Sequence, residues 1–345
     1  FMMIRHICLG LMALLMSSAL LANQVALNPN HPERYVVVKG DTLWDISAKF
    51  LQYPWHWPEI WQVNPQVENP HLIFPGDELV LVYRDGRPVL ELNRGQQTFK
   101  LSPEMREIRM DEAISTIPLS IIRPFLTKPR VVGAEVLDAA PYVVATSDER
   151  LLSGAGDIVY ARGITEPEQD EFSVFRGGKI YFDPNTGEEL GVEAIYSGDA
   201  VVREPGDVST MDLTYTNREV MVGDRLLAVE EEDFDLNFFP RAPSQPMEGV
   251  IISVFDGVSQ VGQYQIVVLN IGRRDGLETG HVLSVYKAGK TIRDAVSEDR
   301  KAMVTLPDEH AGEAMVFKLY DKVSYAIVMK ATTSMHLFDK VRSAE

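Results

Sequence analysis

The spacing of hydrophobic residues changes along the chain, and the first clear pattern lies in residues 35–83. A β-branched run ends in a Gly-Asp turn, which predicts a short strand. Leu43, Ile46 and Phe50 follow at helical spacing. The stretch "WPEIWQVN" (57–64) predicts a second helix, and "DELVLVY" predicts a closing strand. The order β-α-α-β predicts a small α+β module.

The first of these helices carries a start signal. Thr42 is placed to cap it, and Asp45 at the third helical position suits both the cap and the helix dipole. In the second helix, Pro58 occupies a first-turn position where its missing N–H group costs little.

From residue 84 onward the pattern changes to short strands. A unit recurs in which glycine and a polar residue open an apolar run, as expected for a turn that leads into a strand. The irregular spacing of these units excludes a solenoid and predicts mainly-β barrel or sandwich-like domains. The units lie at 75–83, 155–163, 197–204, 222–231, 279–287 and 311–320.

Composition shifts divide this region. Residues 84–236 form a β-rich middle region with some helix near 102–126, where the periodicity is mixed. Residues 237–246 are rich in proline and predict a linker. Residues 247–345 form a C-terminal β domain, in which the charged stretch 289–311 predicts a mobile loop.

The N-terminal segment has the pattern of a secretory signal peptide at residues 1–22, with cleavage after Ala22. An uncleaved anchor is the alternative interpretation. Residues 23–34 are polar and predict a short linker. Cys8, inside the apolar run, is the only cysteine, so we expect a mature chain without disulfides. The segment predicts export.

The charge narrows the range of partners. The formal net charge is −17, and removal of Arg5 with the signal peptide makes it −18. A nucleic-acid partner requires a basic surface, so we expect no nucleic-acid binding. The same charge opposes adhesion to an anionic membrane surface.

Residues 35–83 resemble the LysM carbohydrate-binding module, through "YVVVKGDTLWDISAKF", "VNPQ" and "NPHLIFPGDELVLV". This family binds glycans that contain N-acetylglucosamine, including peptidoglycan and chitin. Its groove lies between the first strand–helix turn and the second helix–strand turn. The resemblance therefore implies glycan-binding residues on two sides of a groove, Gly40, Asp41, Thr42 and Leu43 on one and His71, Leu72, Ile73 and Phe74 on the other.

The chemistry of that groove suits an N-acetyl sugar, whose amide and hydroxyl groups can bind backbone N–H and C=O groups. Gly40 allows the backbone to approach closely. Asp41 has two interpretations, as a helix cap or as an acceptor of a hydrogen bond from the sugar.

All four tryptophans of the chain lie within or beside the predicted helices of this module. A small domain has little core to spare, so we expect Trp44 and Trp61 to be buried. Trp55 and Trp57, near the start of the second helix, are possible aromatic contacts for sugar or protein; burial in the core is the other interpretation.

Signatures of catalysis are weak. The mature chain has no cysteine nucleophile, and its histidines form no HxH or HxxxH pair. The stretch "DEHAGE" (308–313) offers half of a metal site, although a solvated acidic loop is favoured. No phosphate loop or dinucleotide fingerprint occurs. The sequence therefore predicts a protein that is not an enzyme and has no metal or cofactor.

A LysM module followed by a long strand-rich region resembles the type IV pilus secretin-associated protein family of Gram-negative bacteria. The C-terminal part is similar to a domain of a flagellar outer-ring protein, through "GQYQIVVLNIGRRDGLETGHVLSVYKAG" and "SYAIVMKATTSMHLFDKVR". The resemblance implies a periplasmic protein that fixes the outer-membrane secretin to peptidoglycan, with a ring of copies on the secretin. The alternatives are a general LysM cell-wall binding or hydrolase-targeting protein without a pilus role, and a hydrolase.

Overall fold

A computed structural model describes residues 25–61, 73–93, 114–127, 130–147, 150–165, 169–229, 238–255, 260–297, 299 and 301–344. The chain divides into two compact units, Phe1–Pro118 (unit 1) and Leu119–Glu345 (unit 2). The predicted signal peptide and residues 102–113 of the predicted helix lie outside the described residues. Within the described ranges, no helix is both long and apolar enough to cross a membrane.

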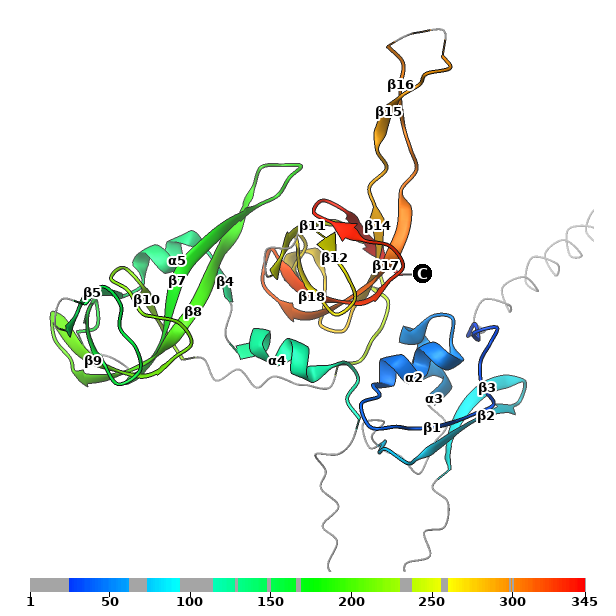
Figure 1. The fold of residues 1–345 in the computed structure, drawn as a ribbon, viewed down its shortest axis with the longest axis horizontal. Coiled ribbons are helices and arrows are strands. Elements are labelled where there is room, and N and C mark those ends of the chain that lie inside the picture. The colour runs from blue at the N-terminus through cyan, green and yellow to red at the C-terminus, as the bar shows by residue number, and fades with distance from the viewer. Residues whose placement is uncertain are drawn as a thin grey trace, which may run out of the picture. The chain divides into compact units, whose positions relative to one another are not determined.

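Unit 1 has the predicted β-α-α-β order with one added strand (Figure 1). The antiparallel sheet has the order β1-β2-β3, and β3 was not predicted. Since β3 pairs with β2 along its whole length, the folded unit continues past residue 83. The elements are β1 (Arg34–Val36), α2 (Leu43–Phe50), the 3-10 helix η2 (Pro54–His56), α3 (Trp57–Trp61), β2 (Glu78–Arg84) and β3 (Arg87–Asn93).

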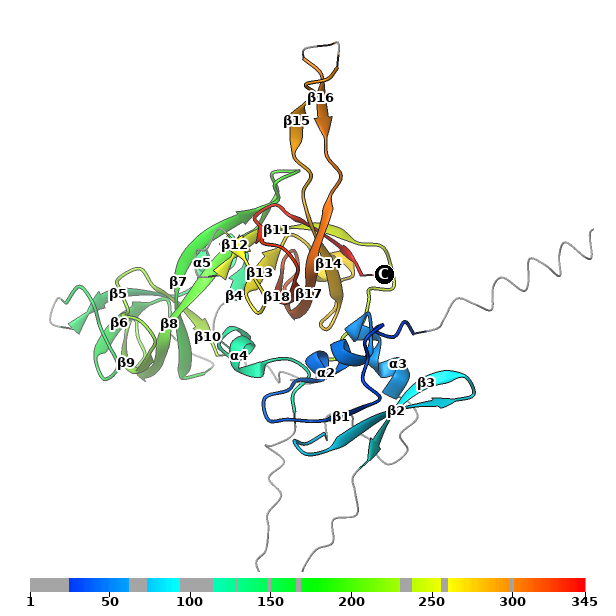
Figure 2. The same cartoon turned by 45° about the vertical axis from the view of Figure 1, so that its right-hand side comes forward.

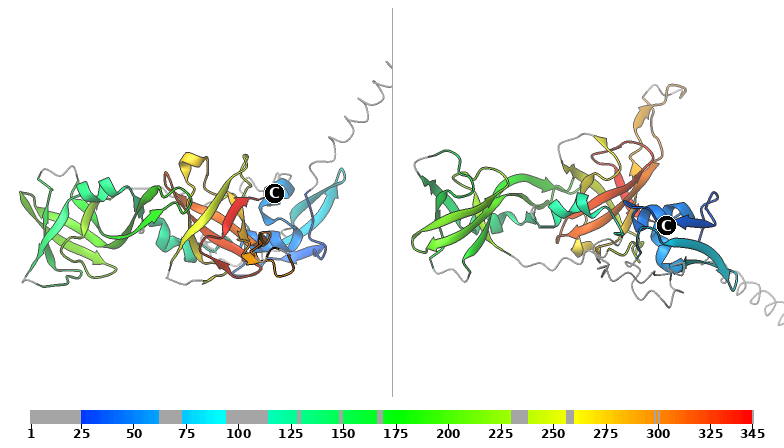
Figure 3. Two further views of the ribbon diagram at one scale, coloured as in Figure 1. Left: turned by 90° about the horizontal axis from the view of Figure 1, so that it is seen from above. Right: turned by 60° about the horizontal axis from the view of Figure 1, so that its bottom comes forward.

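In unit 2, the middle region of the chain forms a second body of strands. Its pairings run β8-β7-β10-β5-β6-β9, and β9 also pairs with β8, so the strands close on themselves. Figure 3 shows them curving round a common interior. The elements are α4 (Leu119–Thr127), β4 (Arg130–Val132), α5 (Ala134–Ala139), β5 (Tyr142–Thr146), β6 (Ile158–Arg162), β7 (Glu171–Phe182), β8 (Glu189–Glu204), β9 (Val208–Thr216) and β10 (Arg225–Ala228).

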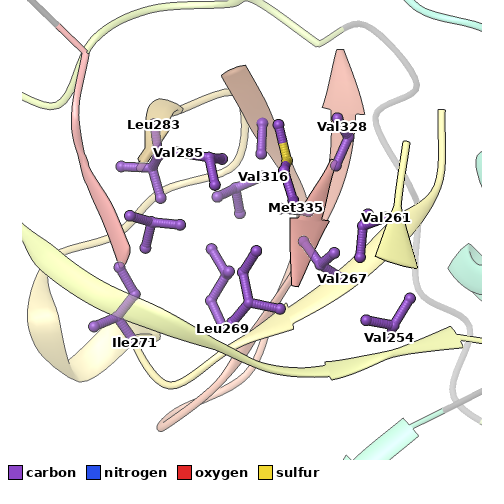
Figure 4. Close-up of a cluster of buried hydrophobic side chains, with 14 of the residues drawn as sticks. Val254, Val261, Val267, Leu269, Ile271, Leu283, Val285, Val316, Val328 and Met335 are labelled. Carbon is purple, nitrogen blue, oxygen red and sulfur yellow. The ribbon is translucent and has the colours of Figure 1, made fainter. Parts of the chain in front are cut away.

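The C-terminal part of unit 2 is a closed barrel with the strand order β11-β13-β18-β17-β14-β20. Its interior is filled by Val, Leu, Ile, Ala and Met side chains, so it is a packed core and not a channel (Figure 4). The elements are β11 (Glu248–Val254), β12 (Gln260–Val261), β13 (Ile266–Leu269), the 3-10 helix η6 (Arg273–Asp275), β14 (Val282–Lys287), β15 (Thr291–Arg293), β16 (Met303–Thr305), β17 (Glu309–Leu319), β18 (Ser324–Ala331), β19 (Met335–His336) and β20 (Lys340–Ser343).

Two segments of this part differ from the sequence predictions. Residues 238–246 of the expected linker include Phe238, which is only 3% exposed, and Arg241, which pairs with the backbone at both sides of His281. This stretch therefore belongs to the folded unit. The expected loop at 289–311 instead contains the strand pair β15–β16, which projects from the barrel as a narrow ribbon (Figure 2).

The β7–β8 hairpin connects the two parts of unit 2. Asn270 of the barrel donates a hydrogen bond to Asp183 at the hairpin's turn, over 2.7 Å. Arg274 and Lys322 both contact the Glu188 carboxylate, at 2.7 and 2.9 Å. These hydrogen bonds lower the pKa of the exposed Glu188 carboxyl to about 2. The hairpin is therefore held against the barrel by these polar contacts.

Four of the six predicted turn–strand units begin with the same turn. A glycine at positive φ precedes a residue whose side chain accepts a hydrogen bond from the backbone N–H group three positions earlier, which is typical of tight turns. The glycines are Gly76, Gly156, Gly223 and Gly280, and the donor–acceptor pairs are Phe74–Asp77, Gly154–Asp157, Met221–Asp224 and Glu278–His281.

The other two predicted turns are wrong. Gly198 lies inside β8 and Gly312 inside β17, each next to a shift in strand register. A Cβ atom at Gly198 would lie 2.3 Å from the Tyr215 carbonyl oxygen, so the glycine there permits close backbone approach and not a turn.

Asp224 offers a direct test of the turn in unit 2. Its side chain is 3% exposed and binds Arg176 through two hydrogen bonds of 2.8 Å, in addition to the Met221 N–H group. Because Asp224→Ala leaves a partly buried guanidinium without its partner, we expect a loss of about 2–4 kcal/mol of unfolding free energy. Urea unfolding followed by circular dichroism measures it.

The matched control is Asp212→Ala, which removes the partner of Arg203 in an exposed ion pair. We expect a loss below about 1 kcal/mol from it. Equal losses in the two variants would contradict the structural role of Asp224.

Candidate functional site

The first side of the expected groove is the turn between β1 and α2. Gly40 has φ of 99° and is exposed, as a tight turn requires. Asp41 accepts hydrogen bonds from the Val38 N–H group and the Tyr35 hydroxyl, both over 2.9 Å and both at the same oxygen. Burial, assisted by this contact with Asp41, raises the pKa of Tyr35 to about 12. Asp41 therefore stabilises the turn between β1 and α2.

Thr42 is the residue that caps α2. Its hydroxyl accepts a hydrogen bond from the Asp45 N–H group over 3.1 Å and donates one to the Asp45 carboxylate over 2.7 Å. The predicted cap is confirmed, and the alternative in which Asp41 caps the helix is wrong. Thr42 and Leu43 are both buried, at 5% and 3% exposure.

The second side of the groove is described only in part. His71 and Leu72 lie outside the described residues. Ile73 is completely buried in the domain core, and Phe74 is half-buried. Phe74 donates its backbone N–H group to Asp77 over 3.0 Å, which holds the turn that leads into β2.

The tryptophans all lie inside the domain, with exposures of 2–7%. Trp44 stacks on Trp55 with ring centroids 6.2 Å apart, and Trp57 meets Trp61 edge to face at 6.5 Å. Each such ring removes about 150–250 Å² from water, a large contribution to a small core. The structure thus places Trp55 and Trp57 in the interior, where neither forms an exposed aromatic platform.

One segment of the site was missed by the sequence analysis. The backbone carbonyl groups of Ser115 and Thr116 accept hydrogen bonds from the N–H groups of Leu43 and Trp44, over 2.9 and 3.2 Å. The N–H group of Ile114 donates to the Ile73 carbonyl over 2.8 Å. Residues 114–117, which we call the groove segment, therefore contact both sides of the expected groove. Their only sequence signal is a short β-branched run.

The stretch 308–313 is not a solvated acidic loop. Asp308 accepts hydrogen bonds from the Gly289 N–H group, Lys340 and Arg342, and these contacts lower its pKa to about 2. Glu313 lies within β17 at 7% exposure, and burial raises its pKa. Among the residues that the structure describes, no group of three or more His, Cys, Asp and Glu residues is placed to hold a metal ion.

The family model described as LysM domain matches residues 35–82, which contain β1 except its first residue, α2, η2, α3 and all but the end of β2. This segment is a LysM domain. LysM domains bind peptidoglycan and related glycans and are not catalytic, so carbohydrate binding in the cell envelope is the activity that the domain implies. Beyond the domain, the match says nothing about the chain.

One curated protein resembles part of the chain. The uncharacterized protein YqbP of Bacillus subtilis (strain 168) is 41% identical over 58 residues. The match covers 14% of this chain and 26% of that protein. The chain thus spans about a quarter of the relative's length.

The contacts of Asp41 predict a role in stability. Asp41→Ala removes two hydrogen bonds that hold the turn before α2, so we expect the LysM domain to lose about 1–2 kcal/mol of unfolding free energy. Tyr35→Phe removes only one of them and should cost about half as much. All four tryptophans belong to this domain, so unfolding followed by tryptophan fluorescence reports on it selectively. Unchanged midpoints in both variants would show that these bonds do not support the turn.

Proposed function

We propose that this chain is a non-catalytic, periplasmic peptidoglycan-binding protein that anchors the outer-membrane secretin of a type IV pilus to the cell wall. The observation that carries the wall-binding half is the LysM domain at residues 35–82. The N-terminal signal pattern supports export. The net charge of −17 opposes a nucleic-acid ligand.

We assign the secretin-binding part of the proposed function to the C-terminal barrel. The two stretches that carry the resemblance to secretin-associated proteins supply β13, β14, β18, β19 and most of β20 of this region. A closed barrel has no free sheet edge, so its loops and the projecting β15–β16 ribbon are the parts available for a partner. These observations support, in the same chain, a wall-binding end and a separate partner-binding end.

Many copies on one secretin would also make the anchor effective. A single small domain that binds a few sugars loses several kcal/mol of rigid-body freedom on association, so its affinity is modest. When several copies are fixed around a symmetric partner, each further domain binds at a raised effective concentration. We therefore expect a ring of copies on the secretin, in which contacts between neighbouring copies close on themselves.

The first test concerns the wall. The full chain should pellet with purified peptidoglycan, whereas residues 119–345 alone should remain in the supernatant. The wall and the protein both carry negative charge, and salt screens their repulsion, so binding should persist or increase as salt rises. Equal pelleting of residues 119–345 would remove the LysM domain as the anchor, and loss of binding at moderate salt would point to ionic attraction instead.

The second test concerns the partner. Deletion of residues 238–345 removes the whole barrel together with the segment packed on it, and should abolish co-purification with the secretin while peptidoglycan binding is retained. Deletion of residues 25–118 should have the opposite effect. If the barrel deletion keeps the secretin and the second deletion loses it, the two ends have exchanged roles. If the full-length protein and both deletion variants all fail to co-purify with the secretin, the general wall-binding alternative holds.

A further inference from the structure

The expected glycan groove is crossed by the chain's own groove segment, residues 114–117. Hydrogen bonds join this segment to Leu43 and Trp44 on one side and to Ile73 on the other. Its side chains are also fixed, because Ile114 is 6% exposed and joins the core of the LysM domain, and Ile117 is fully buried. The contact is therefore made by both backbone and side chains.

The groove segment uses the hydrogen-bond donors at the start of α2. The first N–H groups of a helix have no partner within the helix. Here Leu43 donates to Ser115 and Trp44 donates to Thr116. The next two groups are satisfied locally, because Asp45 donates to the Thr42 hydroxyl and Ile46 to the Thr42 carbonyl. A sugar amide at this helix start thus meets N–H groups that already have acceptors.

The groove segment also presents chemistry similar to that of an N-acetyl sugar. Its backbone carbonyl groups accept hydrogen bonds, as the acetamide oxygen does. The Ile114 N–H group donates to Ile73, as the acetamide N–H group can. The isoleucine side chains fill apolar space, as the acetyl methyl group does. An extended apolar peptide and an N-acetylglucosamine chain therefore offer the same kinds of hydrogen-bonding and apolar groups to this part of the domain.

We propose that the groove of this LysM domain is a binding site for an extended apolar peptide, that residues 114–117 of the same chain occupy it, and that glycan binding requires their release. The proposal rests on the proposed function, since it concerns access to the same groove. The segment is covalently attached 21 residues after Asn93, the end of β3. It therefore competes at the high effective concentration of an intramolecular ligand.

The consequence is measurable as a lower apparent affinity. When only a fraction of molecules has an open groove, the apparent dissociation constant rises in inverse proportion to that open fraction. In the full chain, Ile114→Ser/Ile117→Ser should weaken the binding of the groove segment to the LysM domain without changing the net charge. We expect at least tenfold tighter binding of the β-1,4-linked N-acetylglucosamine tetramer by calorimetry. A synthetic peptide of residues 113–118 should reverse part of that gain.

The matched control is Ile180→Ser/Val296→Ser, which changes one exposed isoleucine and one exposed valine of unit 2. It should bind the tetramer as the unmodified chain does. Tryptophan fluorescence shows whether the LysM domain of each variant is folded. A folded groove-segment variant that binds no tighter than the unmodified chain would overturn the proposal while leaving glycan binding intact. If neither the unmodified chain nor the groove-segment variant binds the tetramer, the proposed glycan function itself is overturned.

A measurement on the unmodified chain covers the case in which the double variant does not fold. The Ile114 N–H group is hydrogen-bonded to Ile73, so its hydrogen exchange should be slow in the free protein and faster once the tetramer is bound. Ile114→Pro, which removes that donor together with the buried isoleucine side chain, should bind the tetramer more tightly than the unmodified chain. Tetramer binding with no change in Ile114 exchange would contradict displacement of the segment.

Discussion

Backbone N–H groups at the starts of strands and helices need acceptors, and several of the described elements begin where such an acceptor is supplied. At the turns before β2, β6 and β10, an aspartate side chain accepts the N–H group three residues earlier. At α2, the Thr42 hydroxyl and the carbonyl groups of Ser115 and Thr116 do so. These turns and the start of α2 are therefore held by polar contacts, some between neighbouring residues and some between residues far apart in the chain.

The sequence predicted those features whose signals are local. The LysM module, the Thr42 cap and the burial of Trp44 and Trp61 follow from spacing within a few residues and are confirmed. The glycine-based turn pattern found four strand starts. It missed the same turn at Tyr264 and Phe338, which have positive φ without being glycine, with Gln265 and Asp339 as the acceptors.

Features that depend on distant residues were not predictable in this way. The groove segment is recognised only by its partners at Leu43, Trp44 and Ile73, far away in the chain. Likewise, residues 238–246 have the composition of a linker, but Phe238 is buried and Arg241 pairs with the backbone of the barrel. The composition of a segment indicates only its local conformational preference, whereas its tertiary contacts determine the structure that it adopts.

The groove segment lies at the C-terminal end of unit 1. It ends at Ile117, and after Pro118 the chain enters α4, so it is also the covalent link between unit 1 and unit 2.

The most direct test of this account is the hydrogen exchange of the Leu43 and Trp44 amide groups in the free, full-length chain. If residues 114–117 supply their acceptors, both amides should exchange as slowly as that of Ile46, whose acceptor is the Thr42 carbonyl inside the helix. Exchange as fast as that of the exposed Lys39 would show that the groove is open and would contradict the account.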